Sequence, residues 1–208
     1  DEDSEVETVD ESSDELNAII ADGDRKLVIL FGSQSGNSED LAFQTQVKSK
    51  EFGLNAEVFD MEGFDLGTLV ETTRLLIICS TWGEGDMPDS AEALWDLISA
   101  EDAPKMENTN FSVCALGDTS YEFYCQSGKD WDRRLEELGA KRVFARQDCD
   151  LDFDEPYSAW AEGALPAISA VGGDAAEVVV ETPVDEDSEV ETVDESSEEL
   201  NAIIADGD

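Results

Sequence analysis

The sequence predicts an α/β fold, in which five parallel β-strands form one sheet that helices cover on both faces. Short apolar stretches alternate with longer amphipathic ones along residues 26–170. The first apolar stretch, KLVILFGS, is apolar without interruption until it reaches its turn residues, as a strand buried on both faces should be. Alternation of this kind is typical of a three-layer sandwich with a parallel sheet in the middle.

Each expected strand is a short apolar run that ends in turn residues. We place the strands at residues 26–33 (KLVILFGS), 56–61 (AEVFDM), 74–81 (RLLIICST), 111–118 (FSVCALGD) and 141–147 (KRVFARQ). Their spacing leaves room for a crossover helix between most consecutive strands, which parallel pairing requires.

The expected helices lie between these strands, at residues 38–52, 89–100, 126–138 and 154–170. Pro88 and Asp89 are favourable residues for a helix start, and Gly139 stops the third helix. The first helix is expected to bury a broad apolar face made of Leu41, Ala42, Phe43, Val47 and Phe52.

The chain begins and ends with the same acidic segment. Residues 1–24 and 185–208 are identical except that Asp14 is replaced by Glu198, and each copy holds 11 acidic residues and no basic one. Repulsion between like charges predicts disordered acidic linkers at 1–24 and 173–208, around one domain at 25–172. The repeat suggests one unit of a tandem array with a period of 184 residues, and an artificially duplicated segment is the alternative.

The composition excludes several classes of function. The chain has 53 acidic residues, 12 basic ones and a net charge of −41, which disfavours nucleic acid or an anionic membrane as partner and favours basic proteins. Adaptation to a saline habitat is the alternative explanation of this acidity. Without histidine or a Cys-x-x-Cys pair, we expect no metal site, and the four cysteines fit a reduced cytoplasmic protein. No apolar run is long enough to cross a bilayer.

Polar loops follow three of the expected strands, at 33–38, 80–90 and 116–125. Ligands of parallel sheets bind at this carboxyl edge. The first loop, SQSGNS, opens a helix, where free backbone N–H groups, hydroxyls and an amide attract an anion. It lacks the Walker Gly-Lys-Ser/Thr ending and the Gly-x-Gly-x-x-Gly fingerprint, so it suits a phosphate monoester, or it is simply a polar turn.

Two of these loops carry an aromatic residue at a comparable place. Trp82 and Tyr121 could stack on the two sides of a flat ring, whereas either residue alone would be explained by packing. Together with the first loop, they predict a site for a phosphorylated, flat ligand.

At these three loops the sequence resembles the flavodoxin-like FMN-binding domain of diflavin reductases, and most of all that of the NADPH-sulfite reductase flavoprotein component. The stretch LGDTSYEFYCQSGKDWDRRLEELGAKR (116–142) is close to that domain's third flavin loop and the helix after it. APKMENTNFSV (103–113), SQSGNS and STWGEGDMPDS (80–90) are similar to its other conserved stretches. The resemblance implies a flavodoxin-like three-layer sandwich with strand order 2-1-3-4-5 and FMN as a non-covalent cofactor.

The resemblance also implies which residues contact the cofactor. The phosphate would be held by Ser33, Gln34, Ser35, Gly36, Asn37 and Ser38. One side of the ring would be lined by Ser80, Thr81, Trp82, Gly83, Glu84 and Gly85. The other side would be lined by Leu116, Gly117, Asp118, Thr119, Ser120, Tyr121, Phe123, Tyr124 and Cys125, with Tyr121 stacked on the ring and Cys125 as a packing residue. Asp148 and Asp150 would face the flavin edge.

The resemblance implies an electron carrier that shuttles single electrons between redox partners. The acidity of the chain predicts that these partners have basic docking surfaces, and the repeated flanks predict neighbouring repeats of the same polypeptide. The Trp82–Gly83 peptide and the carboxylates of Glu84 and Asp86 would favour single-electron steps. Trp82 stands where the sulfite reductase domain has Gln, and the FAD- and NADPH-binding half of a diflavin reductase is absent from this sequence. The alternatives are an FMN-dependent NAD(P)H or quinone reductase, and a non-redox acidic scaffold.

Overall fold

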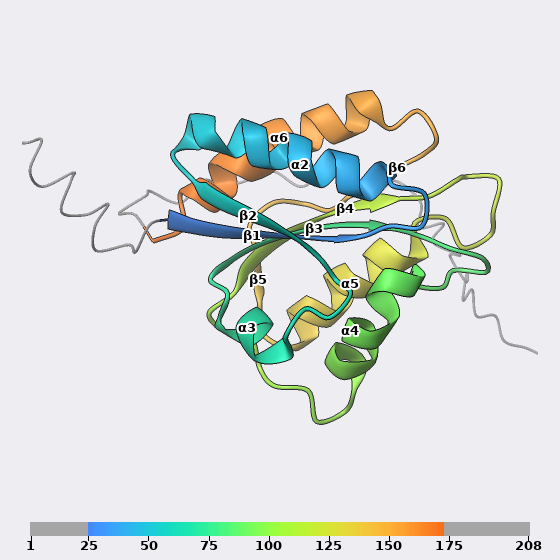
Figure 1. Cartoon of the computed structure of the whole chain (residues 1–208), viewed down its shortest axis with the longest axis horizontal. Helices are drawn as coiled ribbons and strands as arrows, with labels where there is room; N and C mark the ends of the chain where they lie inside the picture. The colour runs from blue at the N-terminus through green and yellow to red at the C-terminus, as the bar shows by residue number, and fades with distance from the viewer. Residues whose placement is uncertain (1–24, 173–208) are drawn as a thin grey trace, which may run out of the picture.

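A computed structural model describes residues 25–172 as a parallel sheet between two layers of helices (Figure 1). The strand order is β2-β1-β3-β4-β5, with β6 also paired to β4, which confirms the order that the resemblance implies. The predicted acidic linkers, and with them the repeated segment, lie outside the described residues.

The central strands are buried on both sides, as their apolar runs predict. The strands are β1 (Lys26–Gly32), β2 (Asn55–Asp60), β3 (Arg74–Ser80), β4 (Asn110–Leu116), β5 (Lys141–Arg142) and β6 (Gln147–Cys149), and all of their pairings are parallel. Within β3, every residue from Arg74 to Cys79 is buried, which explains why this strand shows no alternation of polar and apolar residues.

Within residues 25–172, two α-helices cover one face of the sheet and three cover the other (Figure 1). The first layer holds α2 (Asn37–Ser49), which continues as the short 3-10 helix η2 (Lys50–Phe52), and α6 (Asp154–Ser169). The second layer holds α3 (Leu66–Glu71), α4 (Asp89–Ser99) and α5 (Gln126–Glu137). None of the helices within residues 25–172 combines the length and apolarity that a bilayer crossing needs.

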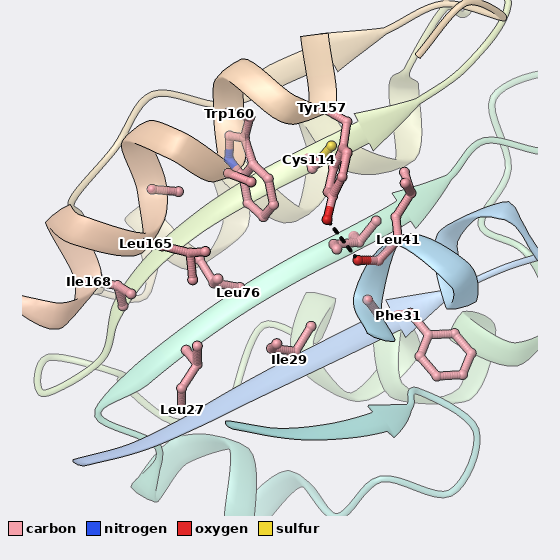
Figure 2. Close-up of a cluster of buried hydrophobic side chains, with 14 of the residues drawn as sticks. Leu27, Ile29, Phe31, Leu41, Leu76, Cys114, Tyr157, Trp160, Leu165 and Ile168 are labelled. Atoms are coloured by element: carbon pink, nitrogen blue, oxygen red, sulfur yellow. Dashed lines mark hydrogen bonds between the residues drawn. The ribbon is translucent and has the colours of Figure 1, made fainter. Parts of the chain in front are cut away.

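Each face of the sheet has its own hydrophobic core. On the α2/α6 face, Leu27, Ile29 and Phe31 of β1 belong to one cluster with side chains of α2 and with Trp160 and Leu165 of α6 (Figure 2). The Tyr157 hydroxyl, buried in the same cluster, donates a hydrogen bond to the Leu41 carbonyl at 3.2 Å, which ties α6 to α2 (Figure 2). The other face buries Leu75 and Ile77 of β3 with α4 and α5. The alternate residues of each strand therefore fill different cores.

The structure differs from the predicted elements at two places. The strand predicted at 141–147 is interrupted between β5 and β6, where the Phe144 ring lies against Gly163 of α6 and Arg146 pairs with Asp148. Edge strands tolerate such an interruption because they pair on one side. The short helix α3 was not predicted, because it is brief; the Asp65 carboxylate caps it by accepting a hydrogen bond from the Thr68 N–H at 2.8 Å.

The predicted apolar face of the first helix was too wide. Leu41 and Ala42 are buried, but Phe43 and Val47 are exposed on the outer side of α2. The buried stripe instead continues through Thr45 and Ser49, whose hydroxyls donate hydrogen bonds to carbonyls one turn earlier in the helix. A hydroxyl whose hydrogen bond is made within its own helix can pack in the core like an apolar group. The buried face of α2 therefore could not be predicted from residue polarity alone.

A change at Gly128 tests how tightly α5 packs on the sheet. A Cβ atom at Gly128 would lie 2.2 Å from the Cβ of Ala115 in β4, so Gly128→Ala should lower the free energy of unfolding by about 2 kcal/mol. The matched control is Gly67→Ala in α3, where the Cβ atom would lie 3.1 Å from the Oδ2 atom of Asp65, a much looser contact, so the free energy of unfolding should change by less than about 1 kcal/mol. Chemical denaturation of both variants checks this, and an undiminished stability of Gly128→Ala would contradict the close contact.

Candidate functional site

A cavity of about 390 Å³ opens at the carboxyl edge of the sheet. This volume falls within the range of small-molecule and cofactor sites. Its walls come from the loops after β1, β3, β4 and β6. The topology explains this convergence, because the carboxyl ends of parallel strands meet at one edge.

The loop after β1 turns the chain sharply into α2. Gly36 is the residue before the helix and has φ +92°, a left-handed conformation that glycine adopts without strain. The Ser33 hydroxyl accepts a hydrogen bond from the Gly36 N–H at 2.9 Å and thereby fixes the turn. Gln34, Ser35 and Asn37 line the cavity. The first turn of α2 therefore begins at the cavity wall.

Ser38 carries the clearest sign of a ligand at this loop. Its side chain is completely buried, and its Oγ atom has no hydrogen-bond partner in the described structure. A buried hydroxyl without a partner costs free energy, so proteins rarely keep one without a use for it. A phosphate oxygen bound at the start of α2 would supply the missing acceptor. The residues present therefore fit the phosphate of FMN.

The loop after β3 forms a tight turn that presents Trp82. The backbone of Trp82 pairs with that of Asp86 in both directions, with N–O distances of 2.9 and 2.8 Å. Gly83 and Gly85 have positive φ angles of 52° and 101°, which close the turn. Ser80, Thr81, Trp82 and Gly83 line the cavity, and 53% of the Trp82 side chain is exposed. A large aromatic ring is thus available to a ligand.

The loop after β4 forms another wall. Its lining residues are Leu116, Gly117, Asp118, Tyr121, Phe123 and Tyr124. A Cβ atom at Gly117 would lie 2.6 Å from the Cys125 backbone nitrogen, so glycine is required where the loop doubles back on itself. Tyr121 is 61% exposed. This loop and the loop after β3 therefore each contribute an accessible aromatic ring to one cavity.

Cys125 lies behind this wall. It is buried, and its thiol lies 3.4 Å from the Ala115 carbonyl oxygen. Burial raises the pKa of the Cys125 thiol to about 12, so the reactive thiolate is scarce near neutral pH. These properties favour the predicted packing role. Cys79, Cys114 and Cys149, like Cys125, are free and buried.

The fourth loop, after β6, adds wall residues that the motif comparison missed. Asp150 lines the cavity as expected, and Leu151 and Phe153 line it beside Asp150. Asp148 instead pairs with Arg146, with 2.6 Å between Oδ1 and Nε. The pattern DLDFDE, in which exposed acids alternate with Leu151 and Phe153, is a signal in the sequence that could have indicated an apolar wall.

The other predicted site residues lie behind the cavity or at its rim. The residues of this group are Ser33, Gly36, Ser38, Glu84, Gly85, Thr119, Ser120 and Cys125, which shape the loops rather than line the cavity. Gly85 shows how: a Cβ atom there would lie 2.8 Å from the Phe123 Cβ, so the second and third loops touch at this point.

The cavity offers a ligand dipoles rather than positive charge. Asp118 and Asp150 line the cavity, and none of the described lining residues is Lys or Arg. Hydrogen bonds from the Thr119 side chain and the Thr119 and Leu151 backbone lower the pKa of Asp150, which keeps this carboxylate ionised. An anionic ligand must therefore rely on backbone N–H groups, hydroxyls and amides of the first loop.

Sequence comparisons show the family of this chain. A family model described as flavodoxin matches residues 29–163. The flavoprotein alpha-component of NADPH-sulfite reductase from Bacillus subtilis is 45% identical over 152 residues, which cover 73% of this chain and 25% of that protein. Its counterpart from Vibrio parahaemolyticus is 39% identical over 156 residues, with 74% and 25% covered. The chain thus spans about a quarter of the length of these curated relatives.

Solved structures support the fold independently. A flavodoxin from Streptococcus pneumoniae superposes with a TM-score of 0.63 at 23% identity, over 70% of this chain and 98% of that chain. Flavodoxin 2 from Bacillus cereus, solved in its oxidised form, gives a TM-score of 0.59 at 26% identity, over 68% and 97%. Nearly the whole length of each of these structures is matched by this chain.

Proposed function

Because the chain belongs to the flavodoxin family, we propose that residues 25–172 form an FMN-binding module that passes single electrons between redox partners. The observation that carries this proposal is the buried Ser38 hydroxyl, which lacks a partner at the start of α2, directly behind a cavity that Trp82 and Tyr121 line. FMN has a part for each place, because its phosphate would bind at the start of α2 and its flat ring would lie at the two aromatic side chains.

Different residues of the chain would contact the phosphate and the ring of FMN. The first loop would bind the phosphate through backbone N–H groups and the hydroxyls of Ser35 and Ser38. Trp82 and Tyr121 would hold the ring between them and shield it from water. When bound, FMN supplies the redox chemistry, since it takes up and releases electrons singly or in pairs.

Two features of the second loop would tune this chemistry. Gly83, with φ +52°, lets the Trp82–Gly83 peptide present either its carbonyl or its N–H to a ligand. The exposed carboxylates of Glu84 and Asp86 would disfavour additional negative charge in the cavity, which makes full reduction harder than the first electron. Both effects favour single-electron transfer.

A reductive titration with FMN tests the proposed function. The chain with one equivalent of FMN, reduced photochemically, should pass its electrons to a one-electron acceptor and return to the oxidised spectrum. Steady NAD(P)H oxidation by the chain alone would favour a reductase instead. A folded chain that leaves excess FMN free in solution would contradict the proposal and favour a non-redox scaffold.

The redox partners would have basic docking surfaces. Glu84, Glu122 and Asp152 are exposed on the loops that form the cavity mouth, and the whole chain has a net charge of −41. Complementary charge steers such partners toward the site. Free buried thiols at all four cysteines support a reducing, cytoplasmic location.

Salt should slow electron transfer to a basic acceptor. Raising the ionic strength from about 0.05 to about 0.5 M should lower the second-order rate with a basic haem protein such as cytochrome c by about tenfold. Stopped-flow absorbance measures this rate, and the rate with a small uncharged quinone is the control that should change little. Equal salt dependence for the two acceptors would rule out electrostatic docking.

The repeated acidic flanks would join several such modules into one chain. The Arg25 guanidinium donates a hydrogen bond to the Ser169 carbonyl, so both ends of the described region meet, at the edge of the sheet where β1 begins (Figure 1). The cavity opens at the other edge, where the strands end. Linkers attached there would leave every cavity uncovered. Limited proteolysis of the parent protein should give fragments spaced by one unit of 184 residues, and a single unit without a ladder would contradict the array.

A further inference from the structure

We propose that Asp150 is a positioning residue that clamps the loop after β4 in the conformation that receives FMN; this inference rests on the proposed FMN binding. One Asp150 carboxylate oxygen accepts a hydrogen bond from the Thr119 N–H at 3.0 Å. The other accepts one from the Thr119 hydroxyl at 2.5 Å. A single side chain thus holds both the backbone and the side chain of one residue in a neighbouring loop.

The clamp joins two walls of the cavity that start from neighbouring strands. Thr119 belongs to the loop after β4, and Asp150 belongs to the loop after β6, which pairs with β4. The same carboxylate oxygen that binds the Thr119 N–H also accepts the Leu151 N–H at 2.8 Å. The position of Leu151, a residue that lines the cavity, is therefore coupled to the position of the other loop.

The loop after β4 needs an outside anchor because its tip is open to solvent. Tyr121 is 61% exposed, so packing alone constrains its ring little. Within the loop, the Asp118 carboxylate accepts the Ser120 N–H at 2.8 Å, and the Tyr121 N–H donates to the Asp118 carbonyl at 3.1 Å. These bonds shape the turn, and Phe123 of the same loop meets the loop after β3 at Gly85. The Thr119 bonds to Asp150 attach the turn to the loop after β6, two residues before the Tyr121 ring.

The pair is strongest with an ionised carboxylate. Asp150 accepts hydrogen bonds at both oxygens, whereas an amide would accept at one end only and its NH2 group would have to donate to the Thr119 hydroxyl, in a neutral and weaker bond. Hydrogen bonds to a charged acceptor are also about twice as strong as neutral ones. The lowered pKa of Asp150, caused chiefly by the Thr119 side chain, agrees with this arrangement. Preorganised walls reduce the ordering cost of ligand binding.

Four single substitutions separate a clamp from a simple effect of charge. Asp150→Asn removes both the charge and the two-oxygen acceptor, whereas Thr119→Val removes one hydrogen bond and no charge. Thr119→Ser keeps the hydroxyl. Asp152→Asn removes the same charge from an exposed position two residues away. We measure the FMN dissociation constant and dissociation rate by flavin fluorescence, the visible circular dichroism of the bound flavin, and the Thr119 amide chemical shift without FMN.

The clamp predicts about tenfold weaker FMN binding and faster FMN release for both Asp150→Asn and Thr119→Val. Both should also alter the visible circular dichroism, and Asp150→Asn should shift the Thr119 amide resonance. Thr119→Ser should bind FMN like the unsubstituted protein, and Asp152→Asn should bind it equally or more tightly. The thermal stability of the FMN-free protein should change little, since Asp150 and Thr119 are at the surface.

Other outcomes would overturn the proposal. If Thr119→Val binds FMN normally while Asp150→Asn and Asp152→Asn both bind it more tightly, Asp150 acts through its charge alone. If all four variants bind FMN like the unsubstituted protein, the clamp has no role. If the unsubstituted protein itself binds no FMN, the proposed function fails first, and the Thr119 amide shift still reports whether the hydrogen bonds exist.

Discussion

Ser38→Asp is expected to abolish FMN binding, with a loss of affinity of at least about a thousandfold. The substitution places a carboxylate where the Ser38 hydroxyl is completely buried at the start of α2. Two negative groups would then compete for the same backbone N–H groups, and no basic residue lines the described cavity to neutralise either. Equilibrium dialysis against FMN measures the loss.

The smaller change Ser38→Ala tests the same role of Ser38 by a second measurement, the stability of the FMN-free protein. Because the Ser38 Oγ atom has no partner, its removal should leave the FMN-free protein equally or more stable, while FMN affinity falls about tenfold or more. Ser49→Ala at the other end of α2 is the matched control. The buried Ser49 hydroxyl donates to the Gln46 carbonyl at 2.8 Å, so its loss should lower the free energy of unfolding by about 1 kcal/mol and leave FMN affinity unchanged.

Denaturation curves and FMN titrations of these two alanine variants therefore form a crossed test. The Ser38 hydroxyl should contribute to FMN binding alone, and the Ser49 hydroxyl to folding alone. A Ser38→Ala variant that is clearly less stable yet binds FMN normally would mean that this hydroxyl has an internal partner and does not contact the phosphate.

Replacing both aromatic walls should be the second most damaging change. The double variant Trp82→Ala, Tyr121→Ala should bind FMN about a hundredfold more weakly. The flavin would lose apolar contact area and stacking on each of its two sides. Both side chains are more than half exposed, so the unfolding free energy of the FMN-free protein should change little. Fluorescence titration with FMN measures the affinity, and the single variants show whether the two rings act independently.

Phe43→Ala is the control for this pair. Phe43 is also an exposed aromatic residue, at 48%, but it lies on the outer side of α2 and does not line the cavity. Its removal should leave FMN affinity unchanged. If the double variant binds FMN as tightly as the Phe43→Ala control, the flavin ring does not lie between Trp82 and Tyr121.

Most of the fold could be predicted from local pattern. Continuous apolar runs gave β1, β3 and β4 to within a residue or two, because strands buried on both faces have a simple signature. The interruption between β5 and β6 could not be predicted in this way. It depends on Phe144 packing against α6 and on Arg146 pairing with Asp148 and Asp132, which are contacts made after the chain has folded.

The candidate site was predictable where it depends on loop composition. Hydroxyl-rich loops, glycines and the two aromatic residues indicated the ligand, and the structure places Trp82 and Tyr121 in the wall of one cavity. Leu151 and Phe153 were missed because their stretch carries no motif and reads as an acidic turn. The Asp150–Thr119 pair was missed because the two residues are 31 positions apart and meet only through the pairing of β6 with β4.

The most direct test of the account compares FMN with riboflavin, which has the same ring but no phosphate. Calorimetric titration of the FMN-free protein should show one FMN bound per chain, at least about a hundredfold more tightly than riboflavin, because uncharged donors at the start of α2 hold the phosphate. Equal affinity for the two ligands, or no binding of FMN in excess, would contradict the claim that local dipoles capture an anionic cofactor on this acidic protein.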